Sequence, residues 1–134
     1  MADLTSITAV RPTSNTTFTR VQYGATISAG QPIVKSGTTY VLADANASST
    51  LAAAEGIAIT PGVSGGYGLM ATGGSIILVG TTMVVGTTYL ASRTAGGIMP
   101  ASDRTTGDYV TSLGTASTST QLDMSIVATG VAVP

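Results

Sequence analysis

Hydrophobic and polar positions alternate over short stretches of this chain, and Gly, Ser, Thr and Pro separate the stretches. No segment keeps apolar residues at a period of 3.6 for three helical turns, as an amphipathic helix would. Thr and Val, which favour strands, are among the commonest residues. The pattern predicts an all-β fold: a compact β-barrel or sandwich of short strands with an extended N-terminal arm and at most one short helix.

Several stretches predict particular elements. The strand-like stretches PIVK at 32–35 and TYVLA at 39–43 flank Ser36 and Gly37, a pattern typical of a tight hairpin. The sequence Leu-Ala-Ala-Ala-Glu at 51–55 allows one or two helical turns, which Gly56 would end. These features place the hairpin early in the chain and the short helix directly after it.

The strongest strand signals lie later in the chain. Residues 67–71 and 75–79 predict two strands separated by a turn at 72–74, and the uninterrupted apolar run at 76–79 is expected to be covered on both faces. Residues 108–113 and 121–127 predict a final pair. In the last strand every second residue from Leu122 to Ile126 is apolar, which predicts one dry face and one wet face.

The first sixteen residues lack a strand pattern. Leu4, Ile7 and Val10 are isolated among polar and small residues, and Pro12 interrupts any strand. We therefore expect residues 1–16 to form an extended arm, loosely attached until a partner receives it, and residues 17–134 to form a single β-domain. The alternative interpretation is an ordinary first edge strand.

Charge is scarce and unevenly distributed. Charged residues make up 8% of the chain, against about a quarter in a typical domain, and none occurs from Gly56 to Ser92. Gly, Thr, Ser and Pro break this stretch too often for a membrane helix of about 20 apolar residues. A surface so poor in charge favours contact with other chains. The composition predicts a β-structured part of a larger assembly, with no membrane association.

The residues needed for catalysis are largely missing. The chain has no His and no Cys, which removes the commonest general base, the commonest metal ligand and every disulfide. Lys35 is next to Ser36, and neighbours in a strand point to opposite faces. The net charge of −1 includes no basic stripe for phosphates. We therefore expect no enzymatic activity, no cofactor, no metal and no nucleic acid. The N-terminal residues do not predict a secretory signal.

Four of the eleven charged residues crowd together at Arg93, Asp103, Arg104 and Asp108. As a calcium loop they lack the regular spacing of oxygen ligands and the terminal Glu. As a pair of catalytic carboxylates they have no aromatic pocket nearby in sequence. We expect them to form salt bridges at an interface between subunits, or otherwise an ordinary solvated loop.

Six short motifs occur in an order that resembles a known family. They are AGQPIV at 29–34, TYVLAD at 39–44, EGIA at 55–58, VGTTYL at 85–90, AGGIMP at 95–100 and DYVTSLG at 108–114. With the closing residues 122–134, they resemble the small capsid decoration (cement) proteins of tailed phages. The resemblance covers residues 24–134, and its signal lies in the order and spacing of the motifs. It implies a compact β-domain, commonly trimeric, on the outside of an icosahedral head.

The leading hypothesis is therefore a structural virion protein, assembled in the host cytoplasm, that binds the major capsid protein on the outer capsid surface and bridges its subunits. Leu4, Ile7, Val10 and Pro12 of the arm would add a strand to the capsid subunit. Apolar faces carrying Ile76, Leu78, Met83 and Val85 would close a homotrimer. The alternative is a tail-associated or surface-displayed adhesion module that binds host carbohydrate through exposed aromatic residues.

Overall fold

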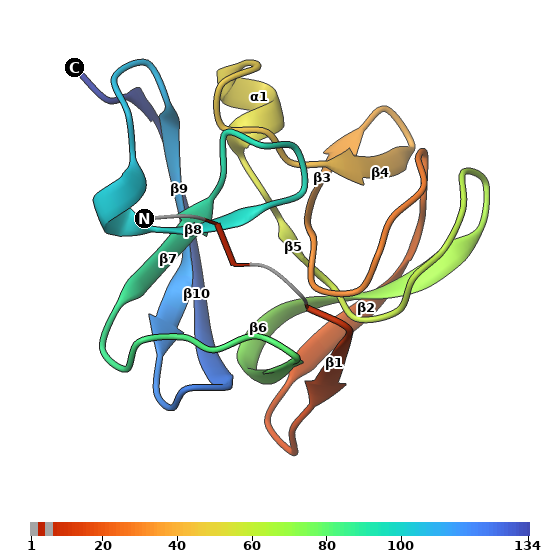
Figure 1. Ribbon diagram of the computed structural model, residues 1–134. Coiled ribbons are helices and arrows are strands. Elements are labelled where there is room, and N and C mark those ends of the chain that lie inside the picture. The colour runs from red at the N-terminus through yellow and green to blue at the C-terminus, as the bar shows by residue number, and fades with distance from the viewer. Residues whose placement is uncertain (1–2, 5–6) are drawn as a thin grey trace.

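The computed structural model describes residues 3–4 and 7–134, and this part of the chain folds into one curled β-sheet with a single α-helical turn (Figure 1). The strands are β1 (Ala9–Pro12), β2 (Thr17–Gln22), β3 (Pro32–Ser36), β4 (Thr39–Leu42), β5 (Gly56–Ala58), β6 (Tyr67–Val79), β7 (Thr88–Ala91), β8 (Ile98–Pro100), β9 (Tyr109–Ala116) and β10 (Gln121–Ala132). The helix α1 is Ser49–Ala52, and a 3-10 turn, η1, is Ala101–Asp103. The predicted all-β class with at most one short α-helix is confirmed.

Strand β6 organises the sheet. The strand order is β4-β3-β5-β6-β10-β9-β7-β8, and β1 and β2 run one after the other along the remaining side of β6. On the opposite side, β5 pairs with the first half of β6 and β10 pairs with the second half. In Figure 1, β6 runs between a group formed by β7–β10 and a group containing β2, β3 and β4.

The turn predicted at residues 72–74 is a bend within this strand, not a break. Gly74 has a φ of 74°, which suits glycine and strains other residues. A Cβ at Gly74 would also collide with the carbonyl of Asn15. β6 therefore continues through both predicted strands, and the bend directs its two halves to different neighbours. The run at 76–79 is not covered on both faces as predicted, since Ile77 and Val79 are only half-buried.

Two local predictions are confirmed with small shifts. β3 and β4 form an antiparallel hairpin around Gly37, whose φ is 66°. The α-helix begins and ends slightly earlier than expected: the hydroxyl of Ser48 accepts a hydrogen bond of 3.1 Å from the Leu51 N–H, and Ala53 ends the helix. Gly56 begins β5 instead of capping the helix.

The apolar side chains form two clusters with β6 between them. The larger contains Ile57, Ala71, Ile76 and Leu78, and the smaller surrounds Tyr23 and includes Val21 and Met70. Tyr23 is fully buried, and its hydroxyl donates a hydrogen bond of 2.6 Å to the Thr60 carbonyl. Burial raises the pKa of Tyr23 above its ordinary value, and the bond to Thr60 offsets the rise in part. The phenol is therefore held in its neutral form.

This environment predicts a loss of stability at alkaline pH. The ordinary pKa of tyrosine is 10.0, and the folded Tyr23 ionises at a higher pH than the unfolded one. Its contribution is fully present below pH 10 and is lost as pH rises through the folded pKa. Tyr40, whose pKa is raised by burial and then by Glu55, acts in the same direction. Urea unfolding should give a lower free energy at about pH 11 than at about pH 8.

A matched variant isolates the tyrosine contribution. Tyr23→Phe cannot ionise, so its unfolding free energy should fall less over the same pH range. Losing the hydrogen bond to Thr60 should cost about 1 kcal/mol at neutral pH. Identical alkaline slopes for the two proteins would contradict the assignment.

The N-terminal segment is part of the sheet. β1 pairs antiparallel with β6, with Val10 opposite Leu78 and Pro12 opposite Ile76. The prediction of a loosely attached arm is therefore wrong for β1, and the alternative of an edge strand describes it. Residues 1–2 and 5–6 of the predicted arm lie outside the described residues.

Candidate interaction surfaces

The predicted arm residues contact their own chain. The Leu4 N–H donates a bond of 2.8 Å to the Ile98 carbonyl, and beside it the Ser92 hydroxyl donates a bond of 2.7 Å to Asp3 Oδ2. Leu4 and Ile7 pack against the larger core cluster, and Val10 belongs to it. Pro12 is exposed at the end of β1. This segment therefore packs against the core of its own chain. Of the four predicted residues, only Pro12 is exposed on the surface.

Three of the four residues predicted for an oligomer interface lie inside the monomer. Ile76 and Leu78 are 0% exposed, and Met83 is 2% exposed. The prediction needs correction for these three, because side chains already buried in one chain cannot supply a surface for another. Val85 is 63% exposed and belongs to the loop between β6 and β7. Only this residue of the set faces solvent.

The charged cluster is mainly an intrachain anchor. Arg93 forms a salt bridge of 3.1 Å with Asp108, a residue that is 3% exposed. Asp108 also accepts a hydrogen bond of 2.9 Å from the Thr105 N–H, and Arg93 donates to the Asp103 carbonyl. Arg104 is exposed and donates to the Ala101 carbonyl at 2.7 Å. Arg93 and Asp108 thus tie the loop before β9 within one chain, and a salt bridge between subunits at this cluster stays a prediction.

The second half of β10 forms a surface that sequence reasoning missed. β10 pairs with β6 only through residues 121–124, and beyond them it pairs with β9 alone. The expected alternation is present up to Met124, and Ile126 is half-buried as predicted. From residue 127 to residue 131 the chain is exposed on both faces, with Val127 at 54% and Val131 at 64%, and Ala132 and Val133 are partly buried. We name residues 125–134 the β10 extension.

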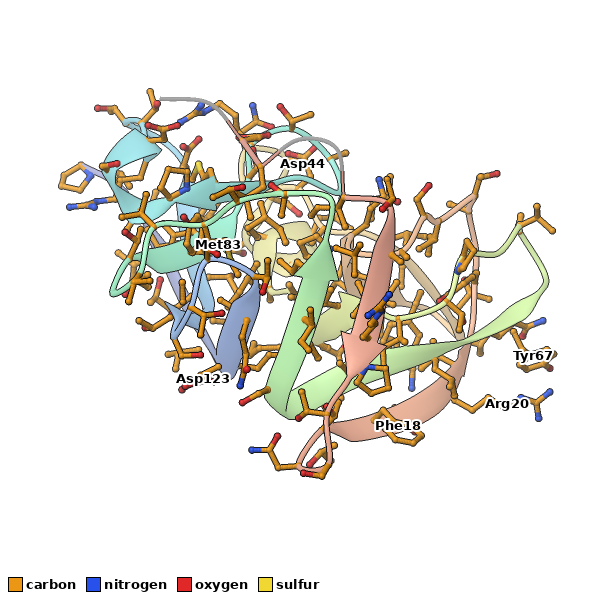
Figure 2. The ribbon with its side chains drawn as sticks, turned by 60° about the horizontal axis from the view of Figure 1, so that its bottom comes forward. Phe18, Arg20, Asp44, Tyr67, Met83 and Asp123 are labelled. Atoms are coloured by element: carbon orange, nitrogen blue, oxygen red, sulfur yellow. The ribbon has the colours of Figure 1, made fainter. Side chains whose placement is uncertain are left out.

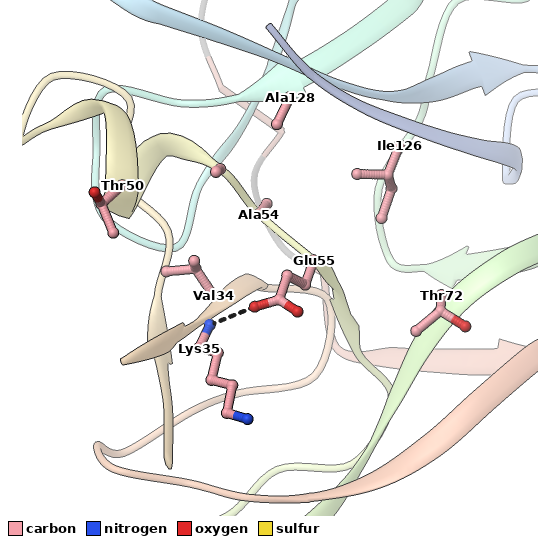
Figure 3. Close-up of a pocket in the computed structure, with 9 residues that line it drawn as sticks. Val34, Lys35, Thr50, Ala54, Glu55, Thr72, Ile126 and Ala128 are labelled. Carbon is pink, nitrogen blue, oxygen red and sulfur yellow. Dashed lines mark hydrogen bonds between the residues drawn. The ribbon is translucent and has the colours of Figure 1, made fainter. Parts of the chain in front are cut away.

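A groove of about 610 Å³ lies beside this surface, where β10 separates from β3 and α1 (Figure 3). Ile126 and Ala128 line one wall, and Val34, Lys35 and Glu55 line the opposite side. The Lys35 N–H donates a bond of 3.0 Å to the Glu55 carboxylate. The groove combines an apolar wall with an open strand edge, which is suited to contact with protein.

The amino-acid sequence contains a pattern that could have indicated the β10 extension. Residues 124–134 contain no charged side chain and continue past the clean alternation with Val, Ala and Gly. A strand that lacks charged residues and does not alternate apolar with polar residues is expected where neither face alone is buried. The sequence does not say whether its second neighbour comes from the same chain.

A second exposed group lies on β2 and β6. Phe18 is 52% exposed and Tyr67 is 57% exposed, and the Arg20 guanidinium lies 4.3 Å from the centre of the Tyr67 ring. Figure 2 shows the three side chains together at one end of the molecule, far from Met83 and Asp44. We name these residues the β2 patch. Neither aromatic residue was assigned to a site from the sequence.

The described part of the chain contains neither a cluster of metal-ligating residues nor a membrane-spanning helix. Within residues 3–4 and 7–134, no three acidic side chains come close enough together to hold a metal ion. No helix in the same residues is long and apolar enough to cross a membrane.

Comparison with models of known protein families finds none that matches this chain, and comparison with curated proteins finds no significant match.

Proposed function

We propose that this chain is a structural virion protein that binds the outer surface of a phage capsid, contacts the major capsid protein and strengthens the shell by bridging its subunits. The ordered motifs at residues 29–114 resemble those of capsid decoration proteins, and the all-β fold is compatible with that class. A protein that acts by binding alone needs uncharged surface that a partner can bury. It needs no titrating group near neutral pH, which fits the absence of His and Cys.

The observation that carries the proposal is the β10 extension. Val127 and Val131 are more than half exposed on the part of β10 that, among the described strands, pairs with β9 alone. An exposed, uncharged strand edge pairs readily with other chains, and soluble proteins normally protect such edges. The β10 extension therefore replaces Ile76, Leu78 and Met83 as the surface proposed to close a homotrimer or to meet the capsid.

A repeated lattice makes weak contacts sufficient. Each copy that contacts two capsid subunits gains effective concentration from the first contact when it makes the second. Modest apolar surfaces, repeated over a shell, then hold the subunits together. This accounts for a small domain with few charges and no Trp.

The second candidate is an adhesion module at the tail or on the virion surface. The β2 patch favours it, because exposed aromatic rings such as Phe18 and Tyr67 are typical of carbohydrate-binding surfaces. The two candidates differ in copy number. Electron microscopy of particles with and without the chain should show many copies over the whole shell for a decoration protein. A few copies confined to the tail would overturn the capsid proposal in favour of adhesion.

A charge on the β10 extension is expected to weaken assembly. In Val131→Lys, burial of an ammonium group against apolar surface carries a desolvation cost, so co-sedimentation with capsids should weaken at least about tenfold. The melting temperature should change little, because Val131 is 64% exposed. Light scattering should show whether the oligomer is lost in the same variant.

Val63→Lys is the matched control, since Val63 is 65% exposed and lies in the loop before β6. It places the same charge on an equally exposed valine away from β10. Capsid binding and oligomeric state of this control should equal those of the unmodified protein. Equal binding by Val131→Lys would remove the β10 extension from the proposed interface.

A further inference from the structure

We propose that the outer edge of β2, together with the β2 patch, binds an extended acidic segment of a partner protein by strand addition. The inference concerns a different surface from the β10 extension, and it stands on the charge, the exposure and the backbone geometry of β2. It does not rest on the proposed function.

The first argument is charge. Arg11 and Arg20 are the only charged residues between Leu4 and Lys35, so β1 and β2 carry two positive charges and no negative one. Both side chains are exposed. Neither guanidinium forms an ion pair with the described residues, and the Arg20 guanidinium lies over the Tyr67 ring. Arg11 lies opposite Ile77 and Arg20 opposite Leu69, so Arg20 alone makes the edge of β2 positive, with no acidic residue on β1 or β2 to offset it. This charge is complementary to an acidic partner.

The second argument is the backbone. β2 pairs with β6 along its length, and β4 meets its other edge only just beyond its C-terminal end, where Tyr23 bridges to Tyr40. The Tyr23 N–H donates to the Gly66 carbonyl at 2.8 Å, and the Gly65 N–H donates to the Tyr23 carbonyl at 2.7 Å, so Tyr23 bonds toward the β6 side. Antiparallel pairing alternates these bonds along a strand. The N–H and C=O groups of Phe18 and Arg20 therefore point away from β6 and are available to an added strand.

The third argument is the side chains around this edge. Phe18 and Arg20 are two positions apart, so they lie on one face of β2, and Tyr67 lies opposite Gln22 on the neighbouring strand. The Arg20 guanidinium is held against the Tyr67 ring, which limits its motion before any partner arrives. An added strand with a carboxylate at every second position would place those carboxylates on the face of Arg20, and its apolar atoms would cover Phe18.

Strand addition distinguishes a peptide from other anions. An acidic polysaccharide offers carboxylates or sulfates and can stack on Phe18 and Tyr67, but it cannot continue the hydrogen bonds of a sheet. The free backbone groups on β2 favour the peptide. A glycan is therefore an outcome of the experiment that would overturn the inference.

The test uses a fluorescent ten-residue peptide of alternating threonine and aspartate, with an alternating threonine and lysine peptide for comparison. Fluorescence anisotropy at low salt should show binding of the acidic peptide to the full chain and none of the basic peptide. Arg20→Gln and Phe18→Ser should each weaken binding about tenfold, which corresponds to about 1.4 kcal/mol. Raising the salt to about 0.15 M, where the screening length falls to about 8 Å, should weaken binding to the unmodified protein.

Arg104→Gln is the matched control, because it removes one exposed positive charge outside β2. It should bind the peptide as the unmodified protein does. An acidic peptide with methylated backbone nitrogens at alternate positions should lose binding, since it cannot donate to the edge of β2. The inference is overturned by equal binding of the methylated peptide, by an equal loss in Arg104→Gln, by no binding of the acidic peptide, or by tighter binding of a sulfated oligosaccharide at the same residues.

Discussion

Replacing Leu78 with alanine is expected to lower the free energy of unfolding by about 2–5 kcal/mol. Leu78 is 0% exposed and belongs to the larger core cluster, and its N–H donates a bond of 2.8 Å to the Thr120 carbonyl. Removing its three terminal carbon atoms loses apolar burial and leaves a cavity beside Val10, its partner across the strands. Urea unfolding followed by circular dichroism measures the change, since the chain has no Trp.

Val85→Ala provides the comparison for this experiment. Val85 is 63% exposed, so its truncation should change stability by no more than about 0.5 kcal/mol. The sequence pattern assigned both residues to one oligomer interface, whereas the structure places Leu78 in the core and Val85 on the surface. If Leu78→Ala kept full stability and only changed the oligomeric state, the structural placement would be refuted.

Arg93→Met should be the second strongly destabilising substitution. It removes the bonds of 3.2 Å and 3.1 Å that Arg93 donates to Asp108, and it leaves a carboxylate that is 3% exposed without its cation. Breaking one partner of a buried pair typically costs 3–5 kcal/mol. Because the Arg93 side chain is 34% exposed, water can partly replace it, and we expect a loss of about 2–3 kcal/mol. Thermal melting in a folded, monomeric sample measures it.

Arg104→Met separates this effect from the loss of a positive charge. Arg104 is exposed and bonds only to the nearby Ala101 carbonyl in the described contacts, so its replacement should cost less than about 1 kcal/mol. The intrachain assignment predicts that Arg93→Met lowers stability by the same amount at every protein concentration. A loss that depended on protein concentration would instead indicate the salt bridge between subunits that the sequence suggested.

Local features of the fold were predictable because they depend on neighbouring residues. Gly37 supplies the positive φ that the β3–β4 hairpin requires, and the alternation from Leu122 to Ile126 predicted the face that β10 buries. The position of α1 was predicted to within a few residues from the alanine run that begins after Leu51, although its Ser48 cap was not used. Such features need little information from distant parts of the chain.

The candidate sites were harder to predict because pairing partners are distant in sequence. Val10 pairs with Leu78, and no property of residues 1–16 alone identifies β6 as their neighbour. The same contact converts the predicted arm into a strand of the sheet and buries residues that looked suited to an interface. The β2 patch likewise needs the register that places Tyr67 beside Arg20.

By itself, the sequence determined the class of fold and the scarcity of charged and reactive side chains. Strand-forming residues punctuated by glycine favour β-structure, and a chain with no His, no Cys and 8% charged residues has few groups for catalysis. Only the tertiary structure decided which apolar residues are buried within one chain. Apolar character is the same whether a side chain is covered by its own fold or by a partner. The bend at Gly74 and the pairing of β6 with four strands bury Leu78 and leave the end of β10 uncovered.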